Sequence, residues 1–178
     1  MDHNSNVFTW GWGEQHQLGR RISHRTRANA LTPSRIGLPG RKIKDIACGA
    51  FHSFAIDDED RVYTWGLNNF GQTGIANGAG EANAVISTPT IIQNLQPYKI
   101  KEIQGGLHHS IAWTEDRKAL VWGRCDDSQL GIPIENLSPT DLIFNSQNKP
   151  RILSKPATIP GNKTVPSDAL PLIATRHI

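Results

Sequence analysis

The chain has 178 residues, of which 37% are hydrophobic and 20% charged, and its formal net charge is +3 at pH 7. This composition, with five tryptophans, excludes a wholly disordered chain. The two cysteines, Cys48 and Cys125, show no Cys-x-x-Cys spacing, so we expect no disulfide framework and no metal site. No apolar run approaches the ~18 residues of a membrane span, so we expect no membrane contact. We also expect no cofactor.

A short phrase recurs at a fixed period along the chain. Trp-Gly occurs three times, successive tryptophans are 55 and 57 residues apart, and a further glycine follows each pair at the same distance. The three pairs are Trp10-Gly11, Trp65-Gly66 and Trp122-Gly123. His52 and His109 each lie thirteen positions before a tryptophan. Such self-similarity predicts a repeat architecture.

The first repeat runs into a strongly basic segment. Residues 15–44 contain no acidic side chain and eight basic ones, while the rest of the chain has 11 basic against 16 acidic residues. A basic surface of this kind attracts phosphate backbones or an acidic protein surface. An ordinary solvated loop is the alternative, because no nucleic-acid-binding motif accompanies the charge. The candidate polyanion patch consists of Arg20, Arg21, Arg25 and Arg27.

The second and third repeats each contain two runs that predict a hairpin. Apolar and β-branched residues at 54–56 and 62–65 flank the polar segment 57–61, and the same pattern returns 57 residues later. Two more strands per repeat are expected at the Ile-x-x-Ile runs and near Thr-Pro, because proline suits the first residue of a strand. Four short strands in a repeat of about 50 residues are typical of a β-propeller blade. We therefore expect an all-β fold.

The repeating residues have structural interpretations. Tryptophan can bury a large apolar face between adjacent blades, and the glycine after it permits a backbone turn that a Cβ would obstruct. A histidine that recurs in each blade is expected to fix a loop by hydrogen bonding. These expectations cover Trp10, Trp65, Trp122, Gly11, Gly66, Gly123, His52 and His109.

Motifs for bond chemistry are missing from the sequence. It has no Gly-Lys-Ser/Thr phosphate loop, no His-Glu-x-x-His and no Gly-x-Ser-x-Gly. The acidic residues 57–60 and 126–127 fall in predicted turns, where carboxylates are usually solvated. We therefore expect neither an enzyme nor a small-molecule substrate.

The C-terminal part departs from the repeat. Seven of the eleven prolines fall between Pro133 and Pro171, and Gly161 is the last of the sixteen glycines. We expect residues 132–154 to form a long loop. Residues 155–178 are expected to begin a further blade that is irregular or truncated, because residues 156–161 echo the segment after Thr32-Pro33.

Three phrases carry a family resemblance. Residues 10–20 read Trp-Gly-Trp-Gly-Glu-Gln-His-Gln-Leu-Gly-Arg, residues 48–56 read Cys-Gly-Ala-Phe-His-Ser-Phe-Ala-Ile, and residues 105–110 read Gly-Gly-Leu-His-His-Ser. They resemble consecutive blades of the regulator of chromosome condensation family, above all its yeast-type exchange factors for the small GTPase Ran. The family has a seven-bladed ring, so we expect an incomplete propeller of about three blades, with two to three blade repeats in residues 1–131, from a fragment or an incomplete gene model.

The resemblance also implies a function. It points to part of a guanine-nucleotide exchange factor that releases GDP from Ran on chromatin, supporting nucleocytoplasmic transport and mitosis, with DNA or histones at the basic region. The expected location is the nucleus, with the cytoplasm as the alternative. His108 matches a family GTPase-contact position, and the preceding repeat has Phe51 there, so blade geometry does not dictate this residue. Ordinary loop packing remains the alternative for His108.

Two other functions stay open. Many proteins carry these repeats as interaction platforms without exchange activity. A repeat-built inhibitor of an unrelated enzyme is a further alternative.

Overall fold

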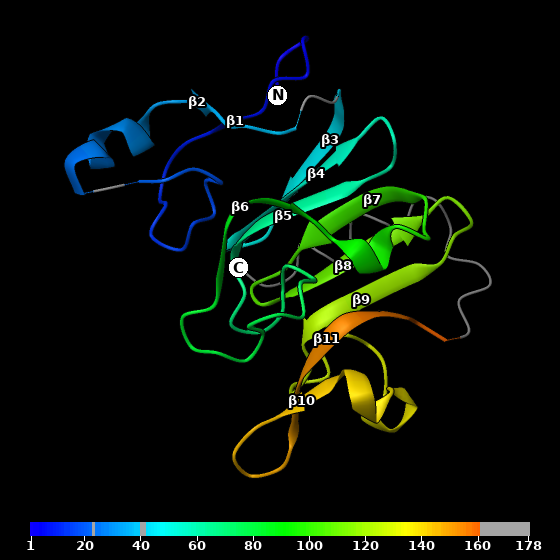
Figure 1. Ribbon diagram of the computed structural model, residues 1–178. Helices are drawn as coiled ribbons and strands as arrows, with labels where there is room; N and C mark the ends of the chain where they lie inside the picture. The colour runs from blue at the N-terminus through cyan, green and yellow to red at the C-terminus, as the bar shows by residue number, and fades with distance from the viewer. Residues whose placement is uncertain (23, 40–41, 161–178) are drawn as a thin grey trace.

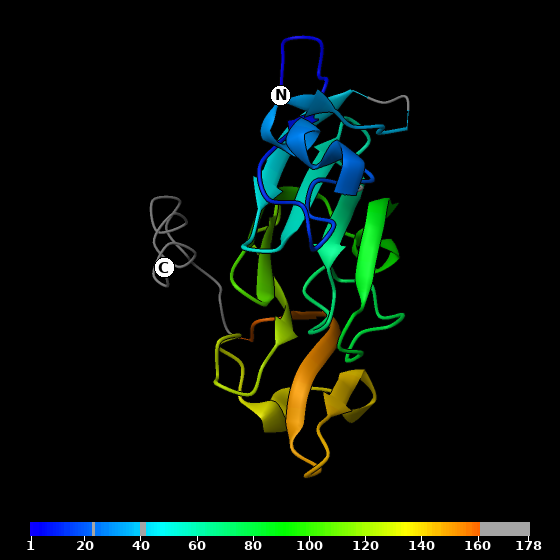
Figure 2. The same ribbon diagram turned by 90° about the vertical axis from the view of Figure 1, so that its left-hand side faces the viewer.

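The computed structural model describes residues 1–22, 24–39 and 42–160, and in these the regular structure consists of strands and short 3-10 helices. The strands form three antiparallel sheets. Figures 1 and 2 show the sheets arranged one after another, from β1, β2 and η1 at one end to β10 and β11 at the other. Among the described residues no helix is long and apolar enough to cross a membrane.

The sheets follow the predicted repeats. The first pairs β1 (Phe8–Thr9) with β2 (Ser34–Arg35), which η1 (His24–Leu31) precedes. The second has the order β3 (Ile43–Cys48), β4 (His52–Asp57), β5 (Val62–Leu67), β6 (Val85–Ile91). The third has the order β10 (Leu142–Phe144), β11 (Pro150–Thr158), β9 (Ala119–Arg124), β8 (His109–Thr114), β7 (Ile100–Gly105). Three more 3-10 turns are η2 (Gln93–Leu95), η3 (Ile134–Asn136) and η4 (Pro139–Asp141).

The gap-free equivalence of the second and third repeats is confirmed. Strands β7, β8 and β9 begin and end 57 residues after β3, β4 and β5, respectively. The register shift after Ile43 in β3 returns after Ile100 in β7. The all-β prediction of propeller blades is therefore correct for this region.

The C-terminal prediction needs correction. Residues 132–154 are not one long loop, because they contain η3, η4, β10 and the first part of β11. Residues 155–158 do not begin another blade: β11 pairs with β9, as β6 pairs with β5, and so belongs to the third sheet, where β10 flanks it on the outer side. The ladder skips Pro156, which has no N–H to donate. The predicted remainder, residues 161–178, lies outside the described residues.

The hairpin turn after β4 is built around a buried carboxylate. Asp57 is fully buried and accepts hydrogen bonds from the backbone N–H groups of Glu59 and Arg61, from Arg61 Nε and from the Tyr63 hydroxyl. Burial alone would raise the pKa of Asp57, but the bonds from Arg61, Glu59 and Tyr63 hold that pKa below its usual value. The expectation of a solvated carboxylate is therefore wrong for Asp57.

The repeated tryptophans join each blade to the one before it. Trp65 Nε1 donates to the backbone oxygen of Gln17 at 2.9 Å, and Trp122 Nε1 donates to that of Gln72 at 3.0 Å. Both indoles are buried, and Trp122 packs in the core between the second and third sheets. The predicted packing role holds for these two.

Trp10 does not follow this pattern. Its side chain is 58% exposed, against 2% or less for Trp65 and Trp122. Trp65 and Trp122 each donate to a Gln backbone oxygen of the preceding repeat, and Trp10 makes no such bond within the described residues. The expectation that Trp10 is packed is therefore wrong for this chain.

Candidate partner-binding site

The loop between β7 and β8 carries His108 and is fixed by the following strand. The backbone oxygen of His108 accepts a hydrogen bond from Arg124 N at 2.9 Å. Gly123 has φ +101°, and a Cβ at this position would lie 2.7 Å from the same oxygen. Only glycine tolerates both the left-handed backbone and the close approach. Gly66 repeats this geometry beneath Phe51, with φ +111° and an approach of 2.4 Å to its oxygen.

His108 sits between aromatic rings of the preceding blade. Its ring stacks on Phe51 with centroids 5.8 Å apart, and lies 4.7 Å from the Phe70 ring. The Gln72 amide nitrogen is 3.5 Å from His108 Nδ1. The imidazole is half-buried, and the structure thus places His108 at a junction of two blades.

Two arginines extend this junction, and the sequence did not lead us to them. Arg124 and Arg151 lie over the Phe70 ring, with 5.3 Å and 4.7 Å from guanidinium carbon to ring centroid. Asp126 pairs with both arginines, at 2.5 Å from Arg124 and 3.8 Å from Arg151. One signal existed: Arg124 replaces the Leu67 of the preceding repeat, just as His108 replaces Phe51. We call His108, Phe51, Phe70, Arg124 and Arg151 the junction cluster.

The electrostatics of the junction cluster favour a neutral imidazole. Burial lowers the pKa of His108, and the positive charge of Arg124 and the neighbouring His109 lower it further. The ring can therefore act as a hydrogen-bonding group at pH 7, not as a cation. Asp126 and Asp127 pair with Arg124, so its charge is locally balanced.

The repeated histidine holds blades together. His52 is fully buried, and its Nε2 lies 2.8 Å from Ser110 Oγ on β8. Ser110 Oγ in turn donates to the backbone oxygen of Gln72 at 2.7 Å. The pKa of His52 is lowered to about 3, first by burial and then by His109 and His108. His52 thus bonds to a side chain on a strand of the neighbouring blade, whereas we expected it to fix a loop by hydrogen bonding. His109 is only half-buried.

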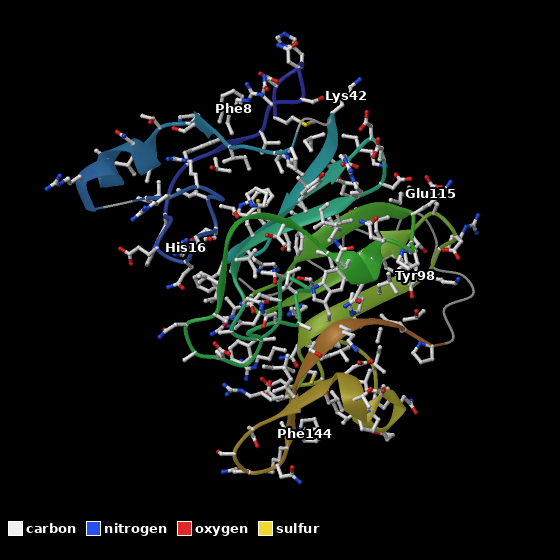
Figure 3. All side chains as sticks on the ribbon, viewed as in Figure 1. Phe8, His16, Lys42, Tyr98, Glu115 and Phe144 are labelled. Carbon is white, nitrogen blue, oxygen red and sulfur yellow. The ribbon has the colours of Figure 1, made fainter. Side chains whose placement is uncertain are left out.

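The arginines of the basic segment differ in their surroundings. Arg20 donates to the backbone oxygens of Thr9 and Asn29, at 3.3 and 3.2 Å, which ties the segment to β1. Arg21 and Arg25 are exposed. Arg27 lies on η1, and its side chain is outside the described part of the chain. Figure 3 shows His16, at the start of this segment, on the same side of the molecule as η1.

Groups suited to metal binding do not gather in the described residues. They contain no cluster of three or more His, Cys, Asp or Glu side chains that could hold a metal ion. Both cysteines are free, and burial raises the pKa of the Cys125 thiol to about 11, so this thiol stays protonated at pH 7.

Comparison with known proteins identifies the family. The family profile of the regulator of chromosome condensation (RCC1) repeat matches residues 4–56 and 59–113. The chain belongs to the regulator of chromosome condensation family. The first matched segment spans β1 to β4 and the second spans β5 to β8, so the boundary between them falls inside the second sheet, at the turn between β4 and β5. The Trp-Gly pairs at residues 10–11 and 65–66 lie within the matched segments.

Individual relatives are similar over most of the chain. Protein pim1 of Schizosaccharomyces pombe is 45% identical over 87% of this chain and 28% of its own length. The guanine nucleotide exchange factor SRM1 of Saccharomyces cerevisiae is 37% identical over 77% of this chain and 28% of its own length. The crystal structure of Prp20p from Saccharomyces cerevisiae, a protein described with its binding to Gsp1p and histones, matches with a TM-score of 0.79 and 34% identity, over 86% of this chain and 34% of that one. The chain therefore spans about a third or less of these relatives.

Proposed function

We propose that this chain is part of a guanine-nucleotide exchange factor that promotes GDP release from a Ran-type GTPase on chromatin, in support of nucleocytoplasmic transport and mitosis. The observation that carries the proposal is the 37% identity to the exchange factor SRM1 over 77% of the chain. The similarity to Prp20p supports a small GTPase and histones as partners. A nuclear location follows from the chromatin partner.

This activity makes and breaks no covalent bond. An exchange factor binds its GTPase more tightly when the nucleotide site is distorted or empty, and linkage requires that it weaken nucleotide binding by the same factor. In this proposal His108 contacts the GTPase. Stacking between Phe51 and Phe70 supports that role, because it holds the imidazole at one position without consuming all of its surface.

Chromatin is proposed to meet the basic segment. Arg21 and Arg25 are exposed and have no acidic residue near them in sequence, so they are free to neutralise phosphates or acidic histone side chains. Arg20 contributes by holding the segment against β1. Arg27 belongs to the same proposed patch by its place on η1.

The test is a chimaeric exchange factor in which this chain replaces the equivalent segment of SRM1. Release of a fluorescent GDP analogue from Ran is followed by stopped flow. We expect the chimaera to stimulate release, and His108→Ala to slow it about tenfold, equivalent to ~1.4 kcal/mol of lost contact. Leu107→Ala is the matched control, because Leu107 is exposed on the same loop and lies outside the junction cluster.

The chimaera experiment distinguishes the exchange proposal from an interaction platform and tests the role of His108. A folded chimaera that binds Ran without releasing GDP would contradict the exchange proposal and favour an interaction platform. Normal release by the His108 variant would remove His108 from the contact. The isolated chain is expected to show little exchange, because it spans only 28% of the length of SRM1.

A further inference from the structure

We infer that Gln72 holds His108 in the neutral tautomer with its proton on Nε2, so that the ring presents a hydrogen-bond donor at the surface. Gln72 is thereby a positioning residue for the partner contact. The tautomer follows from the contacts of this chain, and its use in partner recognition rests on the proposed function.

The first step is the orientation of the Gln72 amide. Its Oε1 accepts a hydrogen bond from the backbone N–H of Phe70 at 2.8 Å. A backbone N–H can only donate, so the oxygen must face Phe70 and the NH₂ group must point the other way. That NH₂ group donates to Asn69 Oδ1 at 3.1 Å. Because Gln72 is fully buried, water does not offer an alternative arrangement.

The same orientation recurs in the other repeats. Gln17 Oε1 accepts from Gln15 N at 3.0 Å, and Gln129 Oε1 accepts from Asp127 N at 2.8 Å. The amide orientation is therefore a property of the repeat and does not depend on His108.

The second step concerns the imidazole. The NH₂ group of Gln72 faces His108 Nδ1 at 3.5 Å, and an amide NH₂ can only donate. Nδ1 must therefore be the acceptor and carry no proton, which leaves the proton of the neutral ring on Nε2. Nε2 has no hydrogen-bond partner within the described residues and is not among their buried unpaired atoms, so it reaches solvent. The lowered pKa of His108 is consistent with a neutral ring.

The third step is the chemistry of the partner. A donor at Nε2 is complementary to a carboxylate or carbonyl oxygen and would meet a lysine or arginine unfavourably. Phe51 and Phe70 hold the plane of the ring, so the donor has a defined direction. The group on the GTPase that meets His108 is thus expected to be an oxygen acceptor.

Nitrogen-15 NMR of the histidine-labelled 178-residue chain tests the tautomer directly. We expect His108 to show an unprotonated Nδ1 and a protonated Nε2. Gln72→Met removes the amide donor and should give a mixture of tautomers. The matched control Gln17→Met, at the equivalent position where the following repeat has Phe51 in place of His108, should leave the His108 signals unchanged. A protonated Nδ1 in the unsubstituted chain would overturn the inference, even if the Gln72 variant did not fold.

A second readout separates this inference from the proposed function. In the SRM1 chimaera, His108→Gln places an amide N–H near the Nε2 position and His108→Asn places one near Nδ1. We expect Gln to retain several-fold more GDP release than Asn. Equal loss in both, with the expected NMR result, would leave the tautomer established and contradict its use in recognition. If neither substitution slows release, the proposed contact fails while the tautomer stands.

Discussion

The indole of Trp122 and the backbone oxygen of Gln72 form a hydrogen bond of 3.0 Å that crosses from the third sheet to the second. The Ser110 hydroxyl donates to the same oxygen at 2.7 Å, and Trp65 repeats the contact on Gln17. One carbonyl therefore binds two side chains of the next blade. The groups around it should be the most sensitive positions of the fold.

Tryptophans in the same repeat phrase are expected to contribute very different amounts to the free energy of unfolding. Trp122→Ala should lower the free energy of unfolding by about 3–5 kcal/mol, because it empties a fully buried site and leaves the Gln72 oxygen short of a donor. Trp10→Ala should change it by less than about 0.5 kcal/mol, since that side chain is 58% exposed. Urea unfolding followed by circular dichroism measures both. Equal losses would show that Trp10 is packed after all.

Stability should fall in mildly acidic solution because of His52. Its pKa is about 3 in the folded chain, against an ordinary value of 6.5 for a histidine in the unfolded chain, so the unfolded chain binds the extra proton first as the pH drops. This contribution is complete above pH 6.5 and is lost progressively between pH 6.5 and about 3, and the loss reaches about 2 kcal/mol at pH 5.

His52→Gln removes this titration and can still donate to Ser110. We expect its free energy of unfolding to vary less between pH 7 and pH 5 than that of the unsubstituted chain. His108→Gln serves as a comparison, because the pKa of His108 is also lowered but its ring is only half-buried. If the free energy of unfolding of the His52→Gln variant fell as much between pH 7 and pH 5 as that of the unsubstituted chain, the loss of stability could not be assigned to His52.

The turn after β4 should depend on one carboxylate. Asp57→Ala is expected to cost about 3 kcal/mol, because it leaves the guanidinium of Arg61 and two backbone N–H groups without their acceptor. Asp58→Ala, next in sequence and exposed, should cost less than about 0.5 kcal/mol. Thermal unfolding of the two variants side by side decides the matter. Similar melting temperatures would show that Asp57 is replaceable.

Binding to polyanions should separate the arginines of the basic segment. Arg21→Ala combined with Arg25→Ala should weaken retention on immobilised DNA and flatten its salt dependence, with about one unit of slope lost per phosphate contact. Arg20→Ala should instead loosen the segment, because its guanidinium bonds Thr9 and Asn29. Lys149→Ala, exposed in the hairpin between β10 and β11, is the control. Retention that does not respond to Arg21 and Arg25 would mean that these side chains are merely solvated.

The repeated part of the fold could be predicted from the sequence, because its signals are local. Alternating apolar runs, Trp-Gly pairs and a constant step of 57 residues define β3 to β5 and β7 to β9. The pairing of β11 with β9 could not be predicted in this way, since Pro156 marks a strand but does not say which sheet receives it. The burial of Asp57 could not be predicted for a related reason. The sequence of a turn does not indicate whether its carboxylate accepts hydrogen bonds from side chains such as Arg61 and Tyr63.

The candidate site was predictable only where a repeat position changed its residue type. His108 stood out because Phe51 occupies the equivalent place. Arg124 offers the same signal, because Leu67 occupies its place in the preceding repeat. The stacking of Phe70 depends on contacts between blades, which sequence spacing does not reveal.

The contact that tryptophan and serine make with the Gln backbone oxygen runs in one direction along the chain. Its acceptor, a Gln backbone oxygen, belongs to the earlier blade, and its donors, a tryptophan and a serine, belong to the later one. During synthesis the N-terminal part appears first, so each new sheet emerges to find its acceptor turn already made. A propeller assembled in this way can add blades one at a time behind the ribosome, with every step completing the polar contacts left open by the last.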